Sequence, residues 1–340
     1  MPAPPRRRNP DPRHLAALTA HRGLATWGER LVPLAEFQAA AAAAGTSLGA
    51  AERQAARRRY RLPVPDPTAV EGPFRKVAVF GGVYSNRLAL AALLEDAARR
   101  QAEAVYCLGD LGGFGPEPEQ VWPLLLGGGV RSIQGNYEQS LAAGREDCNC
   151  GYTDPRDNRF AAISYGYTAR HCSPAFKRWM GELPPRRRVL VGRRELLLVH
   201  GSPRQVNEFL FDSTSSDAFL ELLADRDRCD ALLCTHTGLP WHRRLPSGRD
   251  AVNVGAIGRP ANDGRAEVWY ALLEARPAGP GGGADGLGVE LVPLRYDHPA
   301  MAAAVRAAGL PEEFAETLLT GWWTTCLEIL PARERAASRF

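Results

Sequence analysis

Lysine is nearly absent from this chain of 340 residues, and so are long hydrophobic runs. Lys76 and Lys177 are the two lysines, so arginine supplies almost all of the 42 basic residues, which 38 acidic residues offset to a net charge of +4. A charge this small, spread over both signs, gives no strong signal for nucleic acid. The longest apolar stretch near the start, residues 39–44, is too short to span a bilayer. We therefore expect no association with a membrane.

Cysteine is also sparse. Seven cysteines, an odd number in a chain of this length, do not indicate a disulfide framework. No apolar segment follows the first arginines as it would in a secretion signal. We therefore expect reduced thiols and a cytoplasmic protein. A hydrophobic content of 45% and a charged content of 24% are typical of globular proteins and exclude a collagen, a coiled coil or a wholly disordered chain.

The first 73 residues differ in composition from the rest. They are rich in Ala, Arg and Pro, and their periodicity predicts helices over residues 15–24 and 34–61. The Pro-rich residues 62–73 resemble a linker. We interpret residues 1–73 as a helical extension that precedes the globular domain.

Strands and helices alternate first in the domain of residues 74–296, and strands follow one another later. Strands are predicted over residues 77–80, 104–108, 130–133, 188–191, 195–199, 231–234, 251–254, 266–273 and 289–293. Helices are predicted over residues 86–101, 121–126, 160–171, 174–180, 299–308 and 311–320. Residues 146–158 are expected to form an ordered loop and residues 278–287 a flexible hairpin loop. This order indicates an α/β sandwich of mixed sheets, followed by a helical tail over residues 297–340 that Trp322 and Trp323 anchor to the core.

Polar side chains follow four of the predicted strands. They are Asp110, Asn136, His200 and His236. Positions after strands converge at the carboxyl edge of an α/β sheet, where ligands usually bind. One carboxylate, one amide oxygen and two imidazoles suit a divalent ion such as Mn²⁺, Fe²⁺ or Zn²⁺ better than Mg²⁺ or Ca²⁺. Each side chain alone is better explained as a cap of a strand end or loop, but the four together favour a metal site.

The same residues resemble the motifs of the calcineurin-like metallophosphoesterases over about residues 76–275. That family carries the turns Asp-x-His, Gly-Asp, Gly-Asn-His-Asp or Glu, His-Gly and Gly-His-x-His in this order. The corresponding segments here are Gly82-Val83-Tyr84-Ser85-Asn86, Gly109-Asp110, Gly135-Asn136-Tyr137-Glu138, His200-Gly201-Ser202-Pro203 and Thr235-His236-Thr237-Gly238. Residues 253–260 are similar to the strand and turn that follow the last motif in bacterial members. The resemblance implies a four-layer α/β/β/α sandwich and metal-dependent hydrolysis of phosphate esters.

The sequence departs from the family in one half of the two-metal centre. The resemblance implies that one ion binds the Asp and His of the first motif and the second His of the last. Those positions hold Gly82, Tyr84 and Gly238. Glycine offers no ligand, and a phenol with a pKa of about 10 is a poor one. The four ligands of the other ion are the polar residues named above, so we predict one divalent ion, Mn, Fe or Zn.

The resemblance also suggests roles for residues beside the ion. Tyr137 stands where the family has the His that commonly protonates the leaving oxygen, and a tyrosine is a weak general acid near neutral pH. Tyr84 or Tyr137, with help from Asn86, would steady an anionic substrate. Arg204 and Arg259 are candidates for bidentate phosphate contacts, although a surface ion pair is the commoner role of an arginine.

Three further residues are alternative metal ligands. Cys148 and Cys150 lie in a loop soon after Asn136, from which a thiolate would reach the vacated position. A Cys-x-Cys pair is a weak metal signal, so two small buried loop residues are the other interpretation. His242 would approach from the loop after the last motif, or face solvent on a strand. The other cysteines with apolar neighbours are expected in the core: Cys107, Cys229, Cys234 and Cys326.

Two classes of function remain open at this point. A single ion can lower the pKa of bound water to about 7 and polarise a phosphoryl oxygen, which predicts hydrolysis of a phosphate mono- or diester. The loss of the second positive charge fits equally a pseudoenzyme that binds a phosphate, a nucleotide or a protein. A small phosphorylated molecule is the expected substrate or ligand. The helical extensions suit a homo-oligomer interface or a lid.

Overall fold

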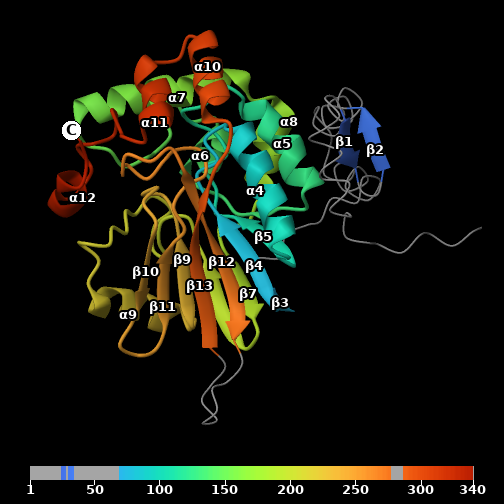
Figure 1. The fold of residues 1–340 in the computed structure, drawn as a ribbon, viewed down its shortest axis with the longest axis vertical. Coiled ribbons are helices and arrows are strands. Elements are labelled where there is room, and N and C mark those ends of the chain that lie inside the picture. The colour runs from blue at the N-terminus through green and yellow to red at the C-terminus, as the bar shows by residue number, and fades with distance from the viewer. Residues whose placement is uncertain (1–23, 28–29, 34–68, 277–285, 340) are drawn as a thin grey trace, which may run out of the picture.

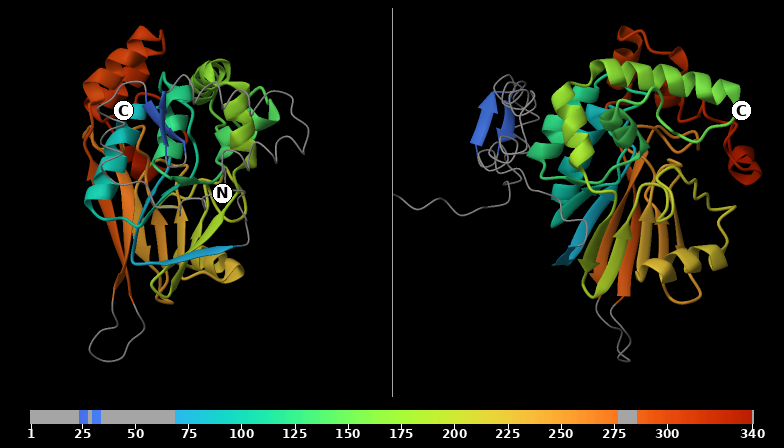
Figure 2. Two further views of the ribbon diagram at one scale, coloured as in Figure 1. Left: turned by 90° about the vertical axis from the view of Figure 1, so that its right-hand side faces the viewer. Right: turned by 180° about the vertical axis from the view of Figure 1, so that it is seen from behind.

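Two mixed β-sheets packed face to face form the centre of the protein (Figure 1). The computed structural model describes residues 24–27, 30–33, 69–276 and 286–339. Helices cover the outer face of each sheet, as the two further views show (Figure 2). The predicted α/β/β/α sandwich is therefore confirmed.

The first sheet has five strands in the order β13-β12-β4-β5-β6. Three neighbours are parallel: β4 (Lys76–Phe80), β5 (Ala104–Cys107) and β6 (Arg131–Ser132). The hairpin of β12 (Val268–Arg276) and β13 (Gly286–Leu294) adds antiparallel to β4. This sheet supplies the turn after β5 and the turn after β6.

The second sheet has six strands in the order β10-β11-β9-β8-β7-β3. Its central pair, β8 (Arg194–Leu198) and β9 (Ala231–Cys234), is parallel. The remaining strands are β11 (Asp250–Asn253), β10 (Trp241–Arg244), β7 (Arg187–Val191) and β3 (Val70–Phe74). The turns after β8 and β9 leave this sheet side by side because the two strands are neighbours.

Eight helices complete the core layers and one short helix lies near the C-terminus, within the described residues. Those packed on the five-stranded sheet are α4 (Arg87–Arg99), α5 (Pro118–Gly127), α6 (Asn136–Ala143), α7 (Pro155–His171) and α8 (Pro174–Glu182). Helix α9 (Asp217–Asp227) covers the six-stranded sheet. Helices α10 (His298–Ala307) and α11 (Glu312–Thr320) pack against α7, and α12 (Ala332–Ala336) follows.

Alternating side chains of the strands explain why the sheets stack. In β4, Val77 and Val79 face the other sheet, whereas Ala78 and Phe80 face the helices. Leu233 of β9 belongs to the same inter-sheet cluster and is fully buried. Because successive residues of a strand point to opposite faces, each short apolar run serves two hydrophobic layers at once.

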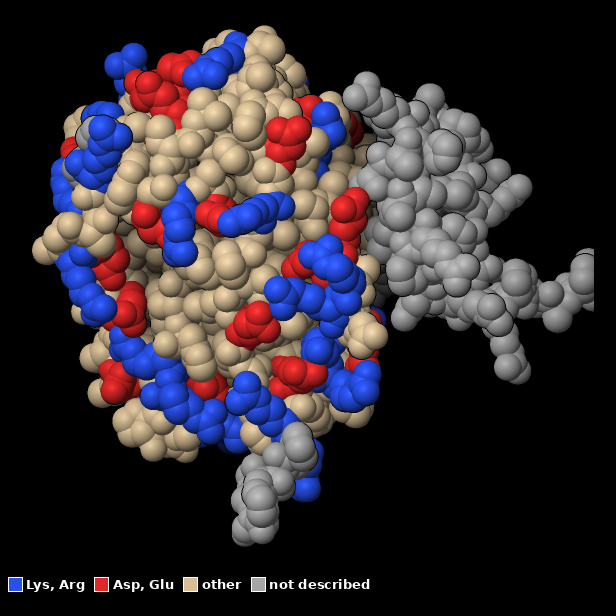
Figure 3. Space-filling view, viewed as in Figure 1, with Lys and Arg blue, Asp and Glu red and all other residues tan. Residues whose placement is uncertain are grey.

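The surface carries charges of both signs. Basic and acidic side chains are interspersed over the face shown in Figure 3. Many arginines pair with carboxylates, as Arg249 does with Glu221 at 3.2 Å. None of the described helices is long and apolar enough to cross a membrane.

Several local predictions need correction. Part of the predicted linker is the edge strand β3, which pairs in parallel with β7. Strand β10 and helix α9 carry too little periodic signal to have been predicted. Helix α7 begins at Pro155, inside the predicted loop of residues 146–158, because Asp154 caps it and proline is favoured in a first turn.

Two predicted features lie almost entirely outside the described residues. The predicted helices of residues 15–24 and 34–61 are outside them except for Leu24, and the antiparallel pair β1 (Leu24–Trp27) and β2 (Arg30–Pro33) lies between the two predicted helices. Most of the predicted loop of residues 278–287 also lies outside them. The aromatic anchor of the tail is confirmed, since Trp323 is 4% exposed and contacts the core.

The inter-sheet cluster predicts a large cost for deleting one of its side chains. Leu233→Ala removes a fully buried side chain and is expected to lower the free energy of unfolding by about 2–5 kcal/mol. The matched control, Leu222→Ala on α9, changes a side chain that is 62% exposed and should stay within about 0.5 kcal/mol of wild type. Urea unfolding followed by circular dichroism measures both. Equal effects of the two substitutions would contradict this packing.

Candidate metal centre

Four polar side chains meet where the two sheets present the carboxyl ends of their parallel strands. Asp110 follows β5 and Asn136 opens α6 after β6, whereas His200 and His236 follow β8 and β9. The turns are tight, and Asp110 and His236 both have a φ of 57°. Asp110 and His236 are 4% and 8% exposed, and the other two are 1% exposed. The residues predicted from sequence are therefore brought together in the interior.

The distances are those of a compact cluster. His200 Nε2 lies 3.0 Å from Asn136 Oδ1, 3.0 Å from His236 Nδ1 and 3.4 Å from Asp110 Oδ1. The ligand atoms of the two histidines and the aspartate all lie within 4.8 Å of one another. One ion placed among these atoms would contact all four side chains.

Hydrogen bonds on the outer side of the cluster orient its lone pairs inward. Leu108 O lies 2.6 Å from His200 Nδ1 and Cys150 O lies 3.2 Å from His236 Nε2, so each of these nitrogens carries a hydrogen. His200 Nε2 and His236 Nδ1 then carry lone pairs in the neutral rings. Asn136 Nδ2 donates to Cys148 O at 2.8 Å, which turns Oδ1 toward His200. Four lone pairs thus face one point and require a cation or a proton between them.

The electrostatics of the buried groups agree with this requirement. Although burial opposes ionisation, the neighbouring His200 lowers the pKa of Asp110. Burial also opposes the charged form of His200, but the carboxylate of Asp110 raises its pKa. Burial and then the charge of His200 lower the pKa of His236 to about 3. One positive charge at the centre is therefore favoured, but protonation of both His200 and His236 is not.

Gly135 allows the cluster to close. A Cβ atom at this position would lie 2.7 Å from Asp110 Oδ1 and 2.8 Å from His200 Cε1, which is closer than atoms pack. The absence of a side chain lets α6 start directly beneath the two ligands. The glycine of the Gly-Asn turn is thus part of the geometry of the site.

Glu138 is a supporting residue to which the sequence analysis assigned no role. Its carboxylate accepts hydrogen bonds from the backbone N–H groups of Asp110 at 2.8 Å, Leu111 at 2.8 Å and Gly135 at 2.7 Å. Burial raises the pKa of Glu138, and so does the nearby Asp110 carboxylate. It ties the turn after β5 to the start of α6. The available signal was its position at the third residue of the helix, where a carboxylate reaches back to the cap.

Side chains pack beside the positions where the resemblance implies ligands of a second ion. A Cβ atom at Gly82 would lie 2.7 Å from Ala256 Cβ and 2.9 Å from the ring of Tyr84. A Cβ atom at Gly238 would lie 3.6 Å from the ring of Trp323. Aromatic rings therefore lie beside both glycines.

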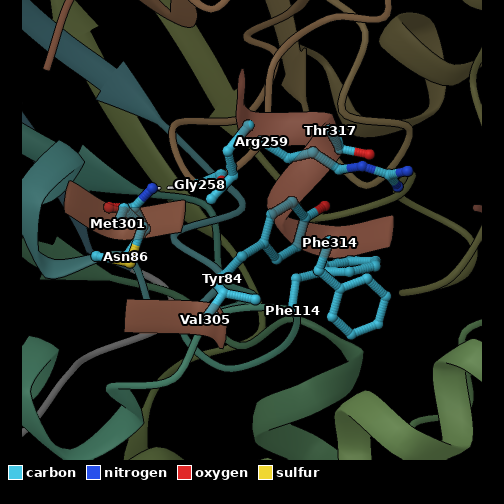
Figure 4. A pocket seen from close by; sticks show the side chains of 11 residues that line it. Tyr84, Asn86, Phe114, Gly258, Arg259, Met301, Val305, Phe314 and Thr317 are labelled. Atoms are coloured by element: carbon cyan, nitrogen blue, oxygen red, sulfur yellow. Dashed lines mark hydrogen bonds between the residues drawn. The ribbon is translucent and has the colours of Figure 1, made fainter. Parts of the chain in front are cut away.

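A narrow pocket borders Tyr84 on the side of the tail helices. Figure 4 shows Tyr84 in its middle, with Arg259 above and Phe114 and Phe314 beside it. The volume of about 10 Å³ is room for a single water molecule. Burial raises the pKa of Tyr84 well above its usual value, and the charge of Asp110 adds to this effect. Tyr84 is thus a neutral phenol beside the cluster.

Arg259 is held by the C-terminal segment. Its guanidinium lies 4.0 Å from the ring centre of Trp323 and 4.8 Å from that of Phe114. It donates to Thr325 O at 2.6 Å and to Thr325 Oγ1 at 3.2 Å. Arg259 is only 6% exposed, and none of the ion pairs of the described residues includes it. This buried cation near the cluster is satisfied by neutral oxygens of the tail.

Other predicted site residues make structural contacts. Asn86 caps α4 by accepting from Ala89 N at 3.0 Å, and its amide donates to Gly258 O at 3.4 Å. Tyr137 O–H contacts Ser164 Oγ at 3.0 Å, and burial raises the pKa of this phenol.

Two predicted residues lie away from the cluster. Arg204 is exposed and pairs with Glu208. His242 lies on strand β10 and contacts Asp250 Oδ1 at 2.9 Å. The structure therefore does not bring Arg204 or His242 to the centre.

Cys148 and Cys150 form a disulfide, which corrects the expectation of seven reduced thiols. The other five cysteines are free and buried, as expected for Cys107, Cys229, Cys234 and Cys326. The bonded pair borders the cluster, because Asn136 Nδ2 lies 3.4 Å from Cys150 Sγ. In this state neither sulfur is a thiolate that could bind an ion.

Comparisons with known proteins agree with this geometry. The model of the calcineurin-like phosphoesterase superfamily domain matches residues 76–276. An uncharacterized protein of Methanocaldococcus jannaschii is 22% identical over 261 residues, which cover 72% of this chain and 98% of the relative.

Two solved structures share the fold. A metallophosphoesterase of Sphaerobacter thermophilus has a TM-score of 0.54 at 24% identity, covering 72% of this chain and 98% of that one. A hypothetical protein of Pyrococcus horikoshii has a TM-score of 0.56 at 22% identity, with coverages of 73% and 99%. Because the family model spans more than half of the chain, and its motif positions form the buried cluster described above, this protein belongs to the calcineurin-like phosphoesterase superfamily.

Proposed function

We propose that this protein is a metal-dependent phosphoesterase that binds one divalent ion, Mn²⁺, Fe²⁺ or Zn²⁺, through Asp110, Asn136, His200 and His236. The observation that carries the proposal is the convergence of four lone pairs within hydrogen-bonding distance of His200 Nε2. Two imidazoles, a carboxylate and an amide oxygen suit a borderline divalent ion. The family of the chain typically binds such ions.

The residues around the cluster would keep these ligands ready. Leu108 O selects the tautomer of His200, and Glu138 holds the backbone of the Asp110 turn. A bound ion would supply a Lewis acid for a phosphoryl oxygen and lower the pKa of a bound water. Arg259 would contribute a fixed positive charge for a phosphate group, provided that the tail residue Thr325 gives up its contact. Mono- and diesters both fit this description.

A second candidate function is a binding module without turnover. Specific contacts favour it. The ring of Tyr84 fills the space beside Gly82, and Thr325 accepts a hydrogen bond from the guanidinium of Arg259. With one ion, the transition state would lose the electrostatic stabilisation that a second ion gives. Such a module would bind a phosphate or nucleotide, or a protein partner, and would keep the same metal site.

The first prediction for this site concerns the number of metal ions bound per chain. Purified protein loaded with Mn²⁺ and desalted should hold one ion per chain, because one complete set of ligands is present. Asp110→Asn and His200→Ala should each lower the affinity for Mn²⁺ at least tenfold, since the first replaces a charged carboxylate ligand by a neutral amide and the second removes a ligand atom. His171→Ala, an exposed histidine on α7, is the matched control and should bind as wild type does. Inductively coupled plasma mass spectrometry and isothermal titration calorimetry measure both quantities. Two ions per chain, or none, would refute the single-ion site.

Hydrolysis is the second prediction for this site. With Mn²⁺ added, wild type should release nitrophenol from bis(p-nitrophenyl) phosphate or p-nitrophenyl phosphate, and Asp110→Asn should lose at least 99% of that rate because the ion is lost with its carboxylate ligand. The absorbance of nitrophenol reports the rate, and His171→Ala controls for trace contaminants. A wild type that binds one ion but gives the same rate as Asp110→Asn would support the binding module instead.

Phosphate affinity distinguishes the two arginines predicted from sequence. Arg259→Lys keeps the charge but loses the bidentate fork, so the apparent Kd for inorganic phosphate should rise about tenfold, as expected for the loss of one charged hydrogen bond. Arg204→Lys should leave the Kd within about twofold, because Arg204 pairs with Glu208 on the surface. Calorimetric titration of the Mn²⁺-loaded proteins measures both, with thermal unfolding as a check of folding. Equal effects of the two substitutions would contradict the placement of phosphate at Arg259.

A further inference from the structure

Half of the predicted metal ligands are held by the core, and the other half by one loop. His200 is oriented by Leu108 O next to β5, and Asp110 by Glu138 of α6. Asn136 and His236 instead bond to the carbonyls of Cys148 and Cys150, respectively. These two carbonyls belong to the two residues that the disulfide joins. The loop therefore helps to set where the lone pairs of Asn136 and His236 point, together with Phe209, whose ring centre lies 4.4 Å from that of His236.

Few other bonds fix this loop. Within the described residues, no hydrogen bond between two backbone groups anchors residues 146–153. Asn207 Nδ2 donates to Asn149 O at 3.1 Å, and the ring centre of Tyr152 lies 6.0 Å from that of Phe209. The disulfide links positions only two residues apart, with a Cα–Cα separation of 5.2 Å, and so restricts the directions of the two carbonyls.

We propose that the Cys148–Cys150 disulfide positions Asn136 and His236 as metal ligands, so that the metal affinity of the centre depends on the redox state of this cysteine pair. The inference rests on the metal site of the proposed function and adds redox regulation of its metal affinity. Cys150 is half-buried and Asn149 is exposed, so a reductant can approach the pair from solvent.

The redox step is an ordinary thiol–disulfide exchange with a dithiol. One thiolate of the dithiol attacks a sulfur of the pair, and its second thiolate then releases the mixed disulfide. The S–S bond of the protein breaks, the dithiol becomes a disulfide, and two electrons and two protons pass to Cys148 and Cys150. The two carbonyls then lose their shared restraint. Asn136 and His236 can rotate away from the inward orientation.

The direction of the effect follows from the outer contacts of the ligands. Loss of such contacts typically costs 10- to 100-fold in metal affinity. We therefore expect the reduced protein to bind Mn²⁺ about 10- to 100-fold more weakly than the oxidised protein. The opposite result is expected if the freed thiols become ligands themselves.

The experiment compares two redox forms of the same metal-free wild-type chain. One sample is kept oxidised, and the other is treated with dithiothreitol, which anaerobic gel filtration then removes. Thiol counts under denaturing conditions should be five in the oxidised form and seven in the reduced form. Calorimetric titration with Mn²⁺ then gives the affinity of each form, and thermal unfolding of the metal-free samples shows that both are folded.

Variants separate the pair from the other cysteines. The double variant Cys148→Ser/Cys150→Ser should bind Mn²⁺ as weakly as reduced wild type and should not respond to dithiothreitol. Cys229→Ser, which changes a buried free cysteine in the cluster under α9, should keep the full difference between the two forms. A double variant with the affinity of oxidised wild type would overturn the proposal.

The remaining outcomes are equally decisive. Equal affinities of the oxidised and reduced wild type overturn the positioning role but leave the metal site intact. Tighter binding by the reduced form, with a sulfur-to-cobalt charge-transfer band when Co²⁺ is the probe, assigns the cysteines as ligands and also overturns it. Absence of binding in both forms refutes the proposed metal site itself, which is a separate failure.

Discussion

The site depends on a repulsion that a cation has to relieve. His200 Nε2 faces an imidazole nitrogen, an amide oxygen and a carboxylate oxygen at distances of 3.0 to 3.4 Å. All of these atoms are buried, so water cannot separate them. The backbone carbonyls outside the cluster keep the hydrogens of both imidazoles on the far side. These outer hydrogen bonds thus orient the site to receive a positive charge.

The chain carries two glycines and a tyrosine where the resemblance implies the ligands of a second ion. The rings of Tyr84, which follows β4, and of Trp323, which follows α11, stand beside Gly82 and Gly238. Arg259 lies on the ring of Trp323 and places a permanent cation in the same region. Aromatic packing and a guanidinium therefore lie beside these positions.

The cover of the site comes from segments that lie far apart in the chain. The disulfide loop between α6 and α7 contacts Asn136 and His236 from one side. The segment after α11 contacts Arg259 and Asn262 from another, through Thr325 and Trp323. Both segments lack long runs of regular structure, so their positions rest on side-chain contacts.

Particular residues show how much of the structure can be predicted from the sequence. The apolar run before Gly109-Asp110 and the one before His200 were enough to place both side chains at strand ends, because period-2 burial and a polar turn residue are local signals. The bounds of β9 matched the prediction residue for residue. Strand β3 was missed because its pairing with β7 joins residues more than a hundred positions apart. Helix α9 was missed because its apolar residues do not lie on one face: Leu220 and Leu223 are buried, whereas Leu222 is 62% exposed.

The sequence by itself determined most of the strands and the four polar side chains at strand ends, since these follow from short-range patterns of hydrophobic and polar residues, and its motifs indicated the four-layer sandwich through their resemblance to a family. Only the tertiary structure decided which contacts surround those four side chains. Arg204 joined a surface ion pair and Arg259 a buried aromatic stack, although both stand next to a proline in the chain. The partners of Glu138, Tyr84 and the Cys148–Cys150 pair come from distant segments, and no local pattern encodes such distances.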